Sequence, residues 1–493
     1  MNNDQTRGEP SGAAGFHNWI SLAGVVLAAG AFFSFLLLFA MDMRGGSSSP
    51  YLGILTFVVA PAFLICGLAL MGLGWLWRRR LERRGQPGGS RSLAIDLSRP
   101  RDRRNLVLFA VGAAVFLLFS AVGSYRAFHF SESVAFCGQT CHTVMEPEHV
   151  TYTASSHAEV ACTKCHVGPG PSGYIRAKLN GVHQLVATLR GNYERPVKVP
   201  PHPLPSEVTC QKCHRSDRQA GDLVRTYTHY LSDETNTVNT VRMLLNVGGG
   251  DPAEGPVRGI HWHTSSGHRI EYVATDARQL VIPWVRLTAA DGKVTEFRTA
   301  KYTNDPAPEA IRTMDCNDCH NRSAHSFPAP NDAVDRAMAA GRIDPALPFV
   351  RSHAIAALTQ TNETVAEGLE KIAGSLRAQY TNEARVASVI AEVQRIYTNS
   401  FFPRMQADWR AYPDHIGHKN WAGCFRCHDG RHQTADKTRK LGASGCNDCH
   451  KIIAQGSGES LAKVEWGGMA FVHPEPSSEG SDPDCFTCHT GGP

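Results

Sequence analysis

The sequence predicts a membrane protein in two parts. An anchor of three N-terminal transmembrane helices precedes a larger outer region that is mostly helical or irregular and contains a small β insert. Two features of the 493 residues lead to this architecture. Three long apolar stretches fall within the first 125 residues, and seven close cysteine pairs follow them, each with a histidine directly after its second cysteine. A chain of this length can hold more than one domain.

The anchor is predicted from three uncharged stretches, residues 20–41, 51–77 and 105–125. Each is long enough to cross about 30 Å of hydrocarbon as a helix. A cleaved signal peptide explains the first stretch poorly, because the apolar run is too long and only one basic residue, Arg7, precedes it. We therefore expect three spans.

The orientation of the anchor follows from arginine. The loop 78–104 contains ten arginines and three acidic residues, whereas the loop 42–50 has only Arg44. The positive-inside rule places the arginine-rich loop in the cytoplasm, so the third span leads the outer region into the periplasm of a bacterial inner membrane. This one loop also accounts for the net charge of +5, so the basic balance reflects topology and does not indicate nucleic-acid binding.

The seven cysteine pairs predict seven covalently attached c-type haems. Two thiols at this spacing reach the two vinyl groups of one porphyrin, and the following histidine supplies the proximal imidazole to the iron. Zinc ribbons or disulfides would not require a histidine after every pair. The attachment cysteines are Cys137, Cys141, Cys162, Cys165, Cys210, Cys213, Cys316, Cys319, Cys424, Cys427, Cys446, Cys449, Cys485 and Cys488. The proximal histidines are His142, His166, His214, His320, His428, His450 and His489.

Two details qualify this pattern. The first pair has three intervening residues where the other six have two. The fifteenth cysteine, Cys66, lies in the second apolar stretch, and we interpret it as a small buried hydrophobic residue. Haem attachment takes place in an oxidising compartment outside the cytoplasm, which agrees with the orientation given by the loop charges.

A haem that only carries electrons usually needs a second axial ligand. Sixteen of the 23 histidines remain after the seven proximal ones are removed. The best placed candidates are His157, His229, His263, His325, His418, His432 and His473. His202, before the third motif, and His261, between the third and fourth motifs, are also available. Met145, three residues after His142, is a candidate thioether ligand for the first haem or a packing residue.

The outer region is expected to contain short helices and loops, because the porphyrins themselves supply buried apolar surface. Strands are predicted at 270–275, 280–287 and 294–299, with Asp291-Gly292 as a hairpin turn. Residues 363–397 read as helical, with a cap near Thr361–Asn362 and a break near 380–382.

These features divide the chain into five segments. They are a membrane anchor over 1–125, a trihaem segment over 126–230, a β insert with the fourth haem over 231–330, a helical segment over 331–400 and a C-terminal trihaem segment over 401–493.

Residues 105–230 resemble the NapC/NirT family of membrane-anchored quinol dehydrogenases. The resemblance rests on a span that leads into Phe136-Cys137, on His142-x-x-Met145, on Ser156-His157-x-x-Val160-x-Cys162 and on the run 165–170. The whole chain resembles the inner-membrane heptahaem cytochromes of metal-reducing bacteria, with Gly259-Ile260-His261-Trp262-His263 and 417–432 as shared features. The additional spans and the longer first motif depart from the small family members.

The resemblance implies oxidation of menaquinol or ubiquinol from the membrane quinone pool at the first haem, with electrons passed to periplasmic cytochromes or other redox proteins. Lys178 matches a family lysine thought to hold the quinol head group, and it reads otherwise as a solvated lysine. Glu146 and Glu148 are candidate proton acceptors, although ordinary surface carboxylates are the simpler interpretation.

Two other functions are open at this point. The chain could serve as an electron-transfer subunit of a larger respiratory complex whose quinone site lies elsewhere. It could also be a terminal reductase of a small oxyanion, which would need one haem with an open iron face. The histidine in every motif disfavours the reductase, because some such enzymes carry lysine there.

Overall fold

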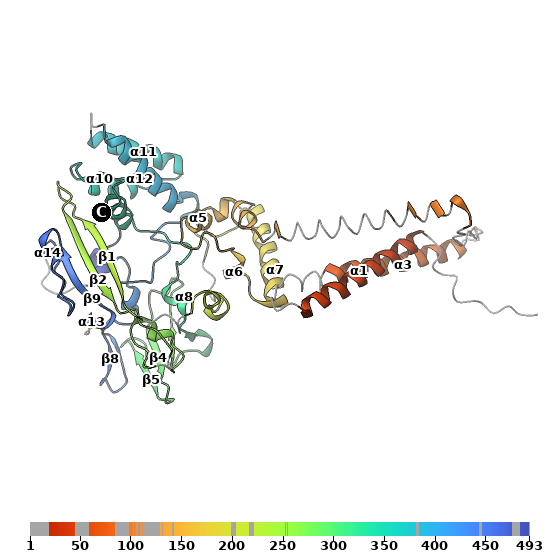
Figure 1. The fold of residues 1–493 in the computed structure, drawn as a ribbon, viewed down its shortest axis with the longest axis horizontal. Coiled ribbons are helices and arrows are strands. Elements are labelled where there is room, and N and C mark those ends of the chain that lie inside the picture. Colours follow the sequence, from red (N-terminus) through yellow and green to blue (C-terminus); the bar gives the residue numbers. More distant parts are fainter. Residues whose placement is uncertain are drawn as a thin grey trace, which may run out of the picture. The chain divides into compact units, whose positions relative to one another are not determined.

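The computed structural model describes residues 19–44, 59–83, parts of 98–111, 129–130, 132–140, 142–198, 204–215, 221–251, 253, 255–380, 384–442, 446–475 and 484–492. The chain divides into two compact units (Figure 1). The smaller unit comprises Met1–Ser133 and Val167–His183, and the larger unit comprises Val134–His166 and Gln184–Pro493. The predicted division into five segments remains a prediction.

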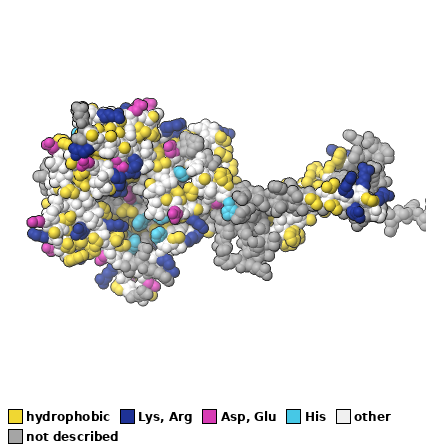
Figure 2. All heavy atoms as spheres, turned by 45° about the horizontal axis from the view of Figure 1, so that its top comes forward, with side chains coloured by type: hydrophobic (Ala, Val, Ile, Leu, Met, Phe, Trp, Pro, Cys, Tyr) yellow, Lys and Arg dark blue, Asp and Glu magenta, His cyan; other side chains and the backbone are white. Residues whose placement is uncertain are grey.

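The smaller unit contains the helices α1 (Trp19–Arg44) and α3 (Ala60–Arg83) and the first part of α7 (Gly170–Leu189). Small residues allow α1 and α3 to approach closely, because a Cβ added to Gly24 would lie 2.6 Å from the carbonyl oxygen of Gly67. Hydrophobic side chains gather along these two helices, and arginines gather at one end (Figure 2). Apolar helices that end in arginines are the feature on which the predicted topology rests.

The structure agrees with the predicted spans in part. Within the described residues, one helical window, Ala60–Trp77, is long and apolar enough to cross a membrane, and the apolar part of α1, Ile20–Leu36, is shorter. The predicted third span, 105–125, lies almost entirely outside the described residues. The predicted burial of Cys66 is wrong, because its side chain is exposed on α3, a position that lipid would cover if α3 spans a bilayer.

The larger unit joins many short helices with strands. Its helices are η3 (Phe136–Thr140), α5 (His142–Thr153), α6 (Thr163–His166), the rest of α7, η4 (Ser206–Val208), η5 (Cys210–Lys212), η7 (Ile260–Thr264), η8 (Pro308–Ala310), α8 (Cys316–Cys319), α9 (Pro330–Ala339), α10 (Val350–Leu358), α11 (Val365–Gln379), α12 (Val386–Ser400), η9 (Pro403–Met405), η10 (Gly423–Arg426), α13 (Cys446–Cys449), α14 (Glu459–Ala462) and α15 (Cys485–Cys488). Most are a single turn, as expected for a chain wrapped round haems.

The main hydrophobic core lies among α9, α10, α11 and α12, where side chains such as Val334, Leu358, Leu376 and Val393 are fully buried. The predicted helical segment is therefore present, with α11 and α12 on either side of 381–383, which lie outside the described residues. The predicted cap was placed too early. The side chain of Thr364, two residues beyond the expected position, accepts the hydrogen bond from the backbone of Glu367.

The predicted β insert supplies four strands of a six-stranded antiparallel sheet in the order β6-β3-β4-β5-β7-β8, and β7 and β8 come from the C-terminal segment. Its strands are β3 (Arg269–Val273), β4 (Trp284–Thr288), β5 (Val294–Arg298), β6 (Arg312–Thr313), β7 (His432–Gln433) and β8 (Lys440–Leu441). All three predicted strands are present, and Gly292 takes the positive φ of 80° that the hairpin between β4 and β5 requires. β4 begins four residues later than expected, directly after Pro283, which has no N–H for the ladder.

A second sheet was not predicted. Here β2 (Val238–Leu245) pairs with β1 (Leu223–Tyr230) on one side and with β9 (His450–Gly456) on the other, all antiparallel. β9 follows directly from the sixth cysteine motif, so this sheet joins the C-terminal haem segment to residues that lie between the third and fourth motifs (Figure 1).

Candidate haem sites

The cysteine motifs share one local geometry. In five of them a backbone hydrogen bond of one helical turn runs from the motif histidine to the carbonyl of the first cysteine, with lengths from 2.8 Å (His214, His320, His489) to 3.1 Å (His428). One turn places residues i and i+3 on the same face. The two cysteines therefore lie on one side, and the histidine begins the next turn, which is the arrangement that porphyrin attachment needs.

The first motif absorbs its additional residue by widening this turn. Its start, Phe136–Thr140, forms the π-helix η3, in which the hydrogen bonds reach one residue further than in an α-helix. A Cβ added to Gly138 would lie 2.0 Å from the ring of His149, so glycine is needed where η3 packs against α5. Cys141 and the side chain of His142 lie outside the described residues.

Six of the seven proximal histidines face a second histidine from elsewhere in the chain. The ring centres of these pairs are 5.8 to 6.4 Å apart. The pairs are His166–His325, His214–His157, His320–His261, His428–His263, His450–His418 and His489–His473.

This spacing fits an iron between the two rings. Metal–imidazole bonds of about 2 Å on each side of an ion place the two ring centres roughly 6 Å apart. The spacing is too wide for face-to-face stacking, which Trp262 and His268 show at 3.8 Å, and edge-to-face contacts such as Phe327–Phe402 at 6.1 Å share it. The residues present therefore fit haem at six positions.

Hydrogen bonds orient four of the distal rings. The Nδ1–H groups of His157, His263, His325 and His473 lie within 2.6 to 3.2 Å of backbone carbonyl oxygens, which belong to Ser323, Ile260, Glu148 and Glu475. With Nδ1 as the donor, the Nε2 lone pair is free to bind a metal. Such a bond to the second nitrogen is the usual way in which proteins orient a ligating histidine.

One short helix supplies two distal rings. His261 and His263 both lie in η7, and they face the fourth and fifth proximal histidines, His320 and His428. Sequence reasoning placed His261 in the right region but did not select it, and chose only His263. The signal was the His-x-His spacing, because in a 3-10 helix residues two apart point in different directions and can serve two neighbouring haems.

Burial sets the protonation state of several pairs. It lowers the pKa of His166, His325, His320 and His261, because a charged imidazolium loses its hydration inside the protein. The neutral imidazole is the form that binds a metal. These shifts favour the ligating form of both histidines in the pairs of the second and fourth motifs.

The first three motifs adjoin one another in order. These sulfurs become thioethers when haem is attached, so their mutual proximity is the useful observation. A hydrogen bond with Cys137 lowers the pKa of the Cys162 thiol to about 7, which places the first and second motifs in contact. Burial raises the pKa of Cys165, and the nearby Cys210 of the third motif raises it further.

The order continues through the fourth and fifth motifs. Burial raises the pKa of Cys316, and Cys210 of the third motif is among the charges that add to this effect. Burial likewise raises the pKa of Cys319 to about 11, with Cys424 of the fifth motif adding to it. The motifs therefore follow one another in space as they do in sequence.

The last two motifs complete the series. The ring of His418, opposite the sixth proximal histidine, stacks on Phe425 of the fifth motif at 4.3 Å. Burial lowers the pKa of His489 of the seventh motif, and Lys419, which follows His418 directly, lowers it further. The seven motifs thus form one continuous row.

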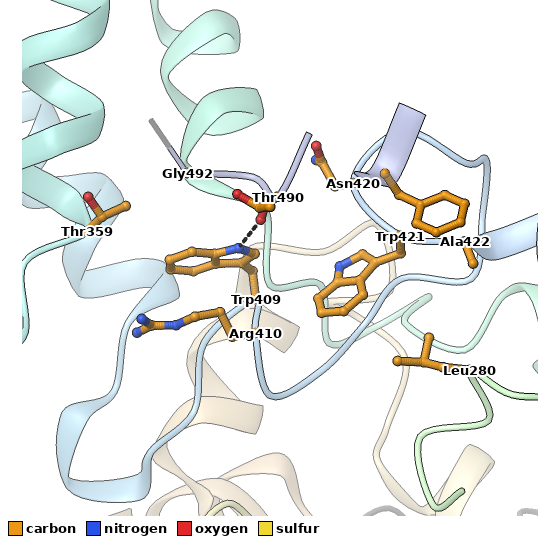
Figure 3. Close-up of a pocket in the computed structure, with 10 residues that line it drawn as sticks. Leu280, Thr359, Trp409, Arg410, Asn420, Trp421, Ala422, Thr490 and Gly492 are labelled. Carbon is orange, nitrogen blue, oxygen red and sulfur yellow. Dashed lines mark hydrogen bonds between the residues drawn. The ribbon is translucent and has the colours of Figure 1, made fainter. Parts of the chain in front are cut away.

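A cavity of about 650 Å³ adjoins the seventh motif. Trp409, Trp421 and Phe486 line it, and the indole N–H of Trp409 donates to the carbonyl of Thr490 at 3.2 Å (Figure 3). Phe486 lies between the two cysteines of that motif, so this aromatic cavity belongs to the haem region.

Two predicted distal ligands have other partners. Both ring nitrogens of His432 are engaged, Nδ1 with the Asp429 carboxylate at 2.8 Å and Nε2 with the Ile282 carbonyl at 2.6 Å, which leaves no nitrogen for an iron. The Nδ1 of His229 lies 3.1 Å from the carboxylate of Asp335, which leaves its Nε2 available, so His229 stays a candidate outside the six ring pairs. Met145 is partly buried in α5, and His202 lies outside the described residues.

The predicted quinol residues occupy different surroundings. Within the smaller unit, the Lys178 ammonium donates to the Glu132 carboxylate at 2.6 Å and lies 4.9 Å from the centre of the Tyr174 ring. In the larger unit, Glu146 is exposed, whereas burial raises the pKa of Glu148 against the lowering effect of Arg322. Glu132 was not predicted, because nothing in the sequence marks a carboxylate 46 residues away as the partner of Lys178.

A comparison with curated proteins finds a relative named "Cytochrome c-type protein ImcH" from Geobacter sulfurreducens (strain ATCC 51573 / DSM 12127 / PCA). The two are 36% identical over an alignment of 493 residues, and the alignment covers 96% of this chain and 95% of the relative. No family model and no solved structure matches the chain.

Proposed function

The chain belongs to the family of this Geobacter cytochrome c-type protein, and from that premise we propose that it is a membrane-bound heptahaem cytochrome that oxidises quinol and passes the electrons to periplasmic acceptors. Membership implies covalently bound haem, whose iron supplies one-electron chemistry. The number of haems, the quinol substrate and the location in the inner membrane are the proposed part.

The observation that carries the proposal is the set of six histidine pairs. Each pair would close both axial positions of an iron, and a closed iron transfers electrons without binding a substrate. An oxyanion reductase needs an open position at its reacting haem, so this set disfavours that alternative for the six paired motifs. The continuous row of motifs supports a path from Cys137 at one end to His489 at the other.

The entry of electrons is proposed on the side of the membrane anchor. Oxidation of a quinol to a quinone releases two electrons and two protons, so the entry site needs a hydrogen-bond donor for the quinol oxygens and acceptors for the protons. We assign the donor to Lys178, held in place by Glu132, and keep Glu146 and Glu148 as candidate acceptors. The Lys178–Glu132 pair belongs to the unit that contains α1 and α3.

The decisive experiment is anaerobic mixing of the purified full chain, in lipid nanodiscs, with a menaquinol analogue while haem absorbance is recorded. We expect reduction on a catalytic timescale. Absence of reduction, with all haems still reducible by dithionite, would refute quinol oxidation and favour an electron-transfer subunit whose quinone site lies on another protein.

A matched pair of lysine variants tests the assigned site. Lys178→Gln should slow quinol-driven reduction by at least tenfold and leave dithionite reduction unchanged. Lys198→Gln is the control, because Lys198 also forms a 2.6 Å ion pair, with Glu194, but is 72% exposed in the larger unit. Equal rates for both variants would remove Lys178 from the proposal and leave quinol oxidation itself standing.

A further inference from the structure

Three motifs carry a basic residue directly before their second cysteine. These residues are Lys164 in the second motif, Lys212 in the third and Arg426 in the fifth. The two lysines are exposed, whereas Arg426 is only 9% exposed. A charge in the same position of the motif is thus solvated in two cases and enclosed by protein in the third.

Three neutral groups hold the Arg426 guanidinium. Its Nε–H donates to the backbone carbonyl of Gly423 at 2.8 Å. One terminal nitrogen donates to the backbone carbonyl of Gln279 at 3.0 Å, and the other donates to the backbone carbonyl of Asp318 at 2.9 Å. Gly423 precedes the fifth motif and Asp318 lies inside the fourth. The side chain therefore ties together the two motifs and the connection between β3 and β4.

No carboxylate offsets this charge directly. Within the described part of the chain, Arg426 forms no ion pair, although burying an unpaired cation is costly. Acidic side chains in or beside the two motifs have other partners. Tyr272 donates to the carboxyl of Asp318, and Asp429 accepts from His432.

The field of the guanidinium reaches the attachment sulfurs of two haems. Arg426 directly precedes Cys427, and the backbone carbonyl that accepts one of its hydrogen bonds belongs to Asp318, which directly precedes Cys319. The same positive charge favours the reduced state of a nearby haem, because reduction removes one positive charge from the iron. Burial keeps the effect strong, since little water lies between the charges.

We propose that Arg426 raises the reduction potentials of the haems on the fourth and fifth motifs and so holds electrons at the middle of the row. Its three hydrogen bonds fix the charge between the two motifs. This role rests on haem attachment to these motifs and does not depend on quinol as the electron source.

The test is a redox titration of the full haem-loaded chain, followed by haem absorbance with chemical mediators and without quinol. Arg426→Gln should shift two of the seven haems to lower potential. Lys212→Gln removes the same charge from the same motif position at the surface and should leave the titration unchanged. Haem content measured by intact mass establishes that each variant carries its full set.

Two outcomes overturn the proposal. One is an Arg426→Gln protein with all haems attached that titrates as the unmodified chain does. The other outcome is measured on Arg426→Lys, which is used if Arg426→Gln does not acquire its haems. This variant keeps the charge with fewer hydrogen-bond donors, so the two haems should retain their high reduction potentials. A shift of both to lower potential would show that charge is not the cause. Failure of quinol oxidation leaves this titration unaffected.

Discussion

Replacing His261 and His432 separately distinguishes a distal ligand from a structural histidine. Both lie in the larger unit, and sequence reasoning selected only His432 as a ligand. The structure places His261 opposite His320 at 6.4 Å, and it engages both nitrogens of His432 with other groups. The two variants should therefore differ in spectrum and in stability.

His261→Ala should leave the haem of the fourth motif with His320 alone. One of the seven haems would then change from low spin to high spin and, when reduced, would bind one additional carbon monoxide per chain. No protein hydrogen bond through Nδ1 is lost, because that nitrogen has no partner within the described residues, so any fall in the free energy of unfolding reflects the lost iron ligand.

His432→Ala should leave the haem spectrum unchanged and destabilise the larger unit. It removes one hydrogen bond to a carboxylate, at roughly 1.5–3 kcal/mol, and one to a carbonyl, at about 1 kcal/mol. The ring is 1% exposed, so the Ile282 carbonyl would lose its partner inside the protein, and the total loss should be about 3 kcal/mol.

The assay combines carbon monoxide difference spectra of the dithionite-reduced proteins with urea unfolding followed by circular dichroism. Additional carbon monoxide binding in His432→Ala, with none in His261→Ala, would refute the assignment from ring pairing. Additional binding in neither variant would refute the ligand role of His261.

Two further predictions concern stability. Asp335 is buried, and desolvation raises the pKa of its carboxyl. Hydrogen bonds from His229 and Arg351 outweigh this effect and hold the pKa below the ordinary value. Asp335→Asn should therefore cost about 3 kcal/mol at pH 7, and urea unfolding should show this difference fading as the pH falls below about 4, where the carboxyl of the unfolded chain is protonated. Gly368→Ala should cost about 1–3 kcal/mol, because its Cβ would lie 2.4 Å from the buried Tyr397 ring. Gly374→Ala in the same helix has open space and should stabilise by about 0.5–1 kcal/mol in the same measurement, and equal effects of both would contradict the predicted clash.

Much of the fold could be predicted where the pattern is local. The hairpin at Asp291-Gly292 and the helical segment that holds α11 and α12 follow from turn chemistry and periodicity, and both are confirmed. The resemblance of the whole chain to membrane cytochromes of metal-reducing bacteria is also confirmed by the Geobacter relative, whereas no family model matches the part that resembles NapC/NirT. The sheet of β1, β2 and β9 was missed, because β2 and β9 are distant in sequence and neither shows its partner in its own residues.

The sequence by itself determined the haem chemistry, since two thiols and an imidazole within one turn act together wherever that turn lies. Only the tertiary structure decided which histidine faces which motif. His325 returns to His166 and His263 reaches His428 across long separations, and such approaches depend on how sheets and helices pack. The same packing encloses Arg426 and leaves Lys212 in solvent, although both occupy the same place in their motifs.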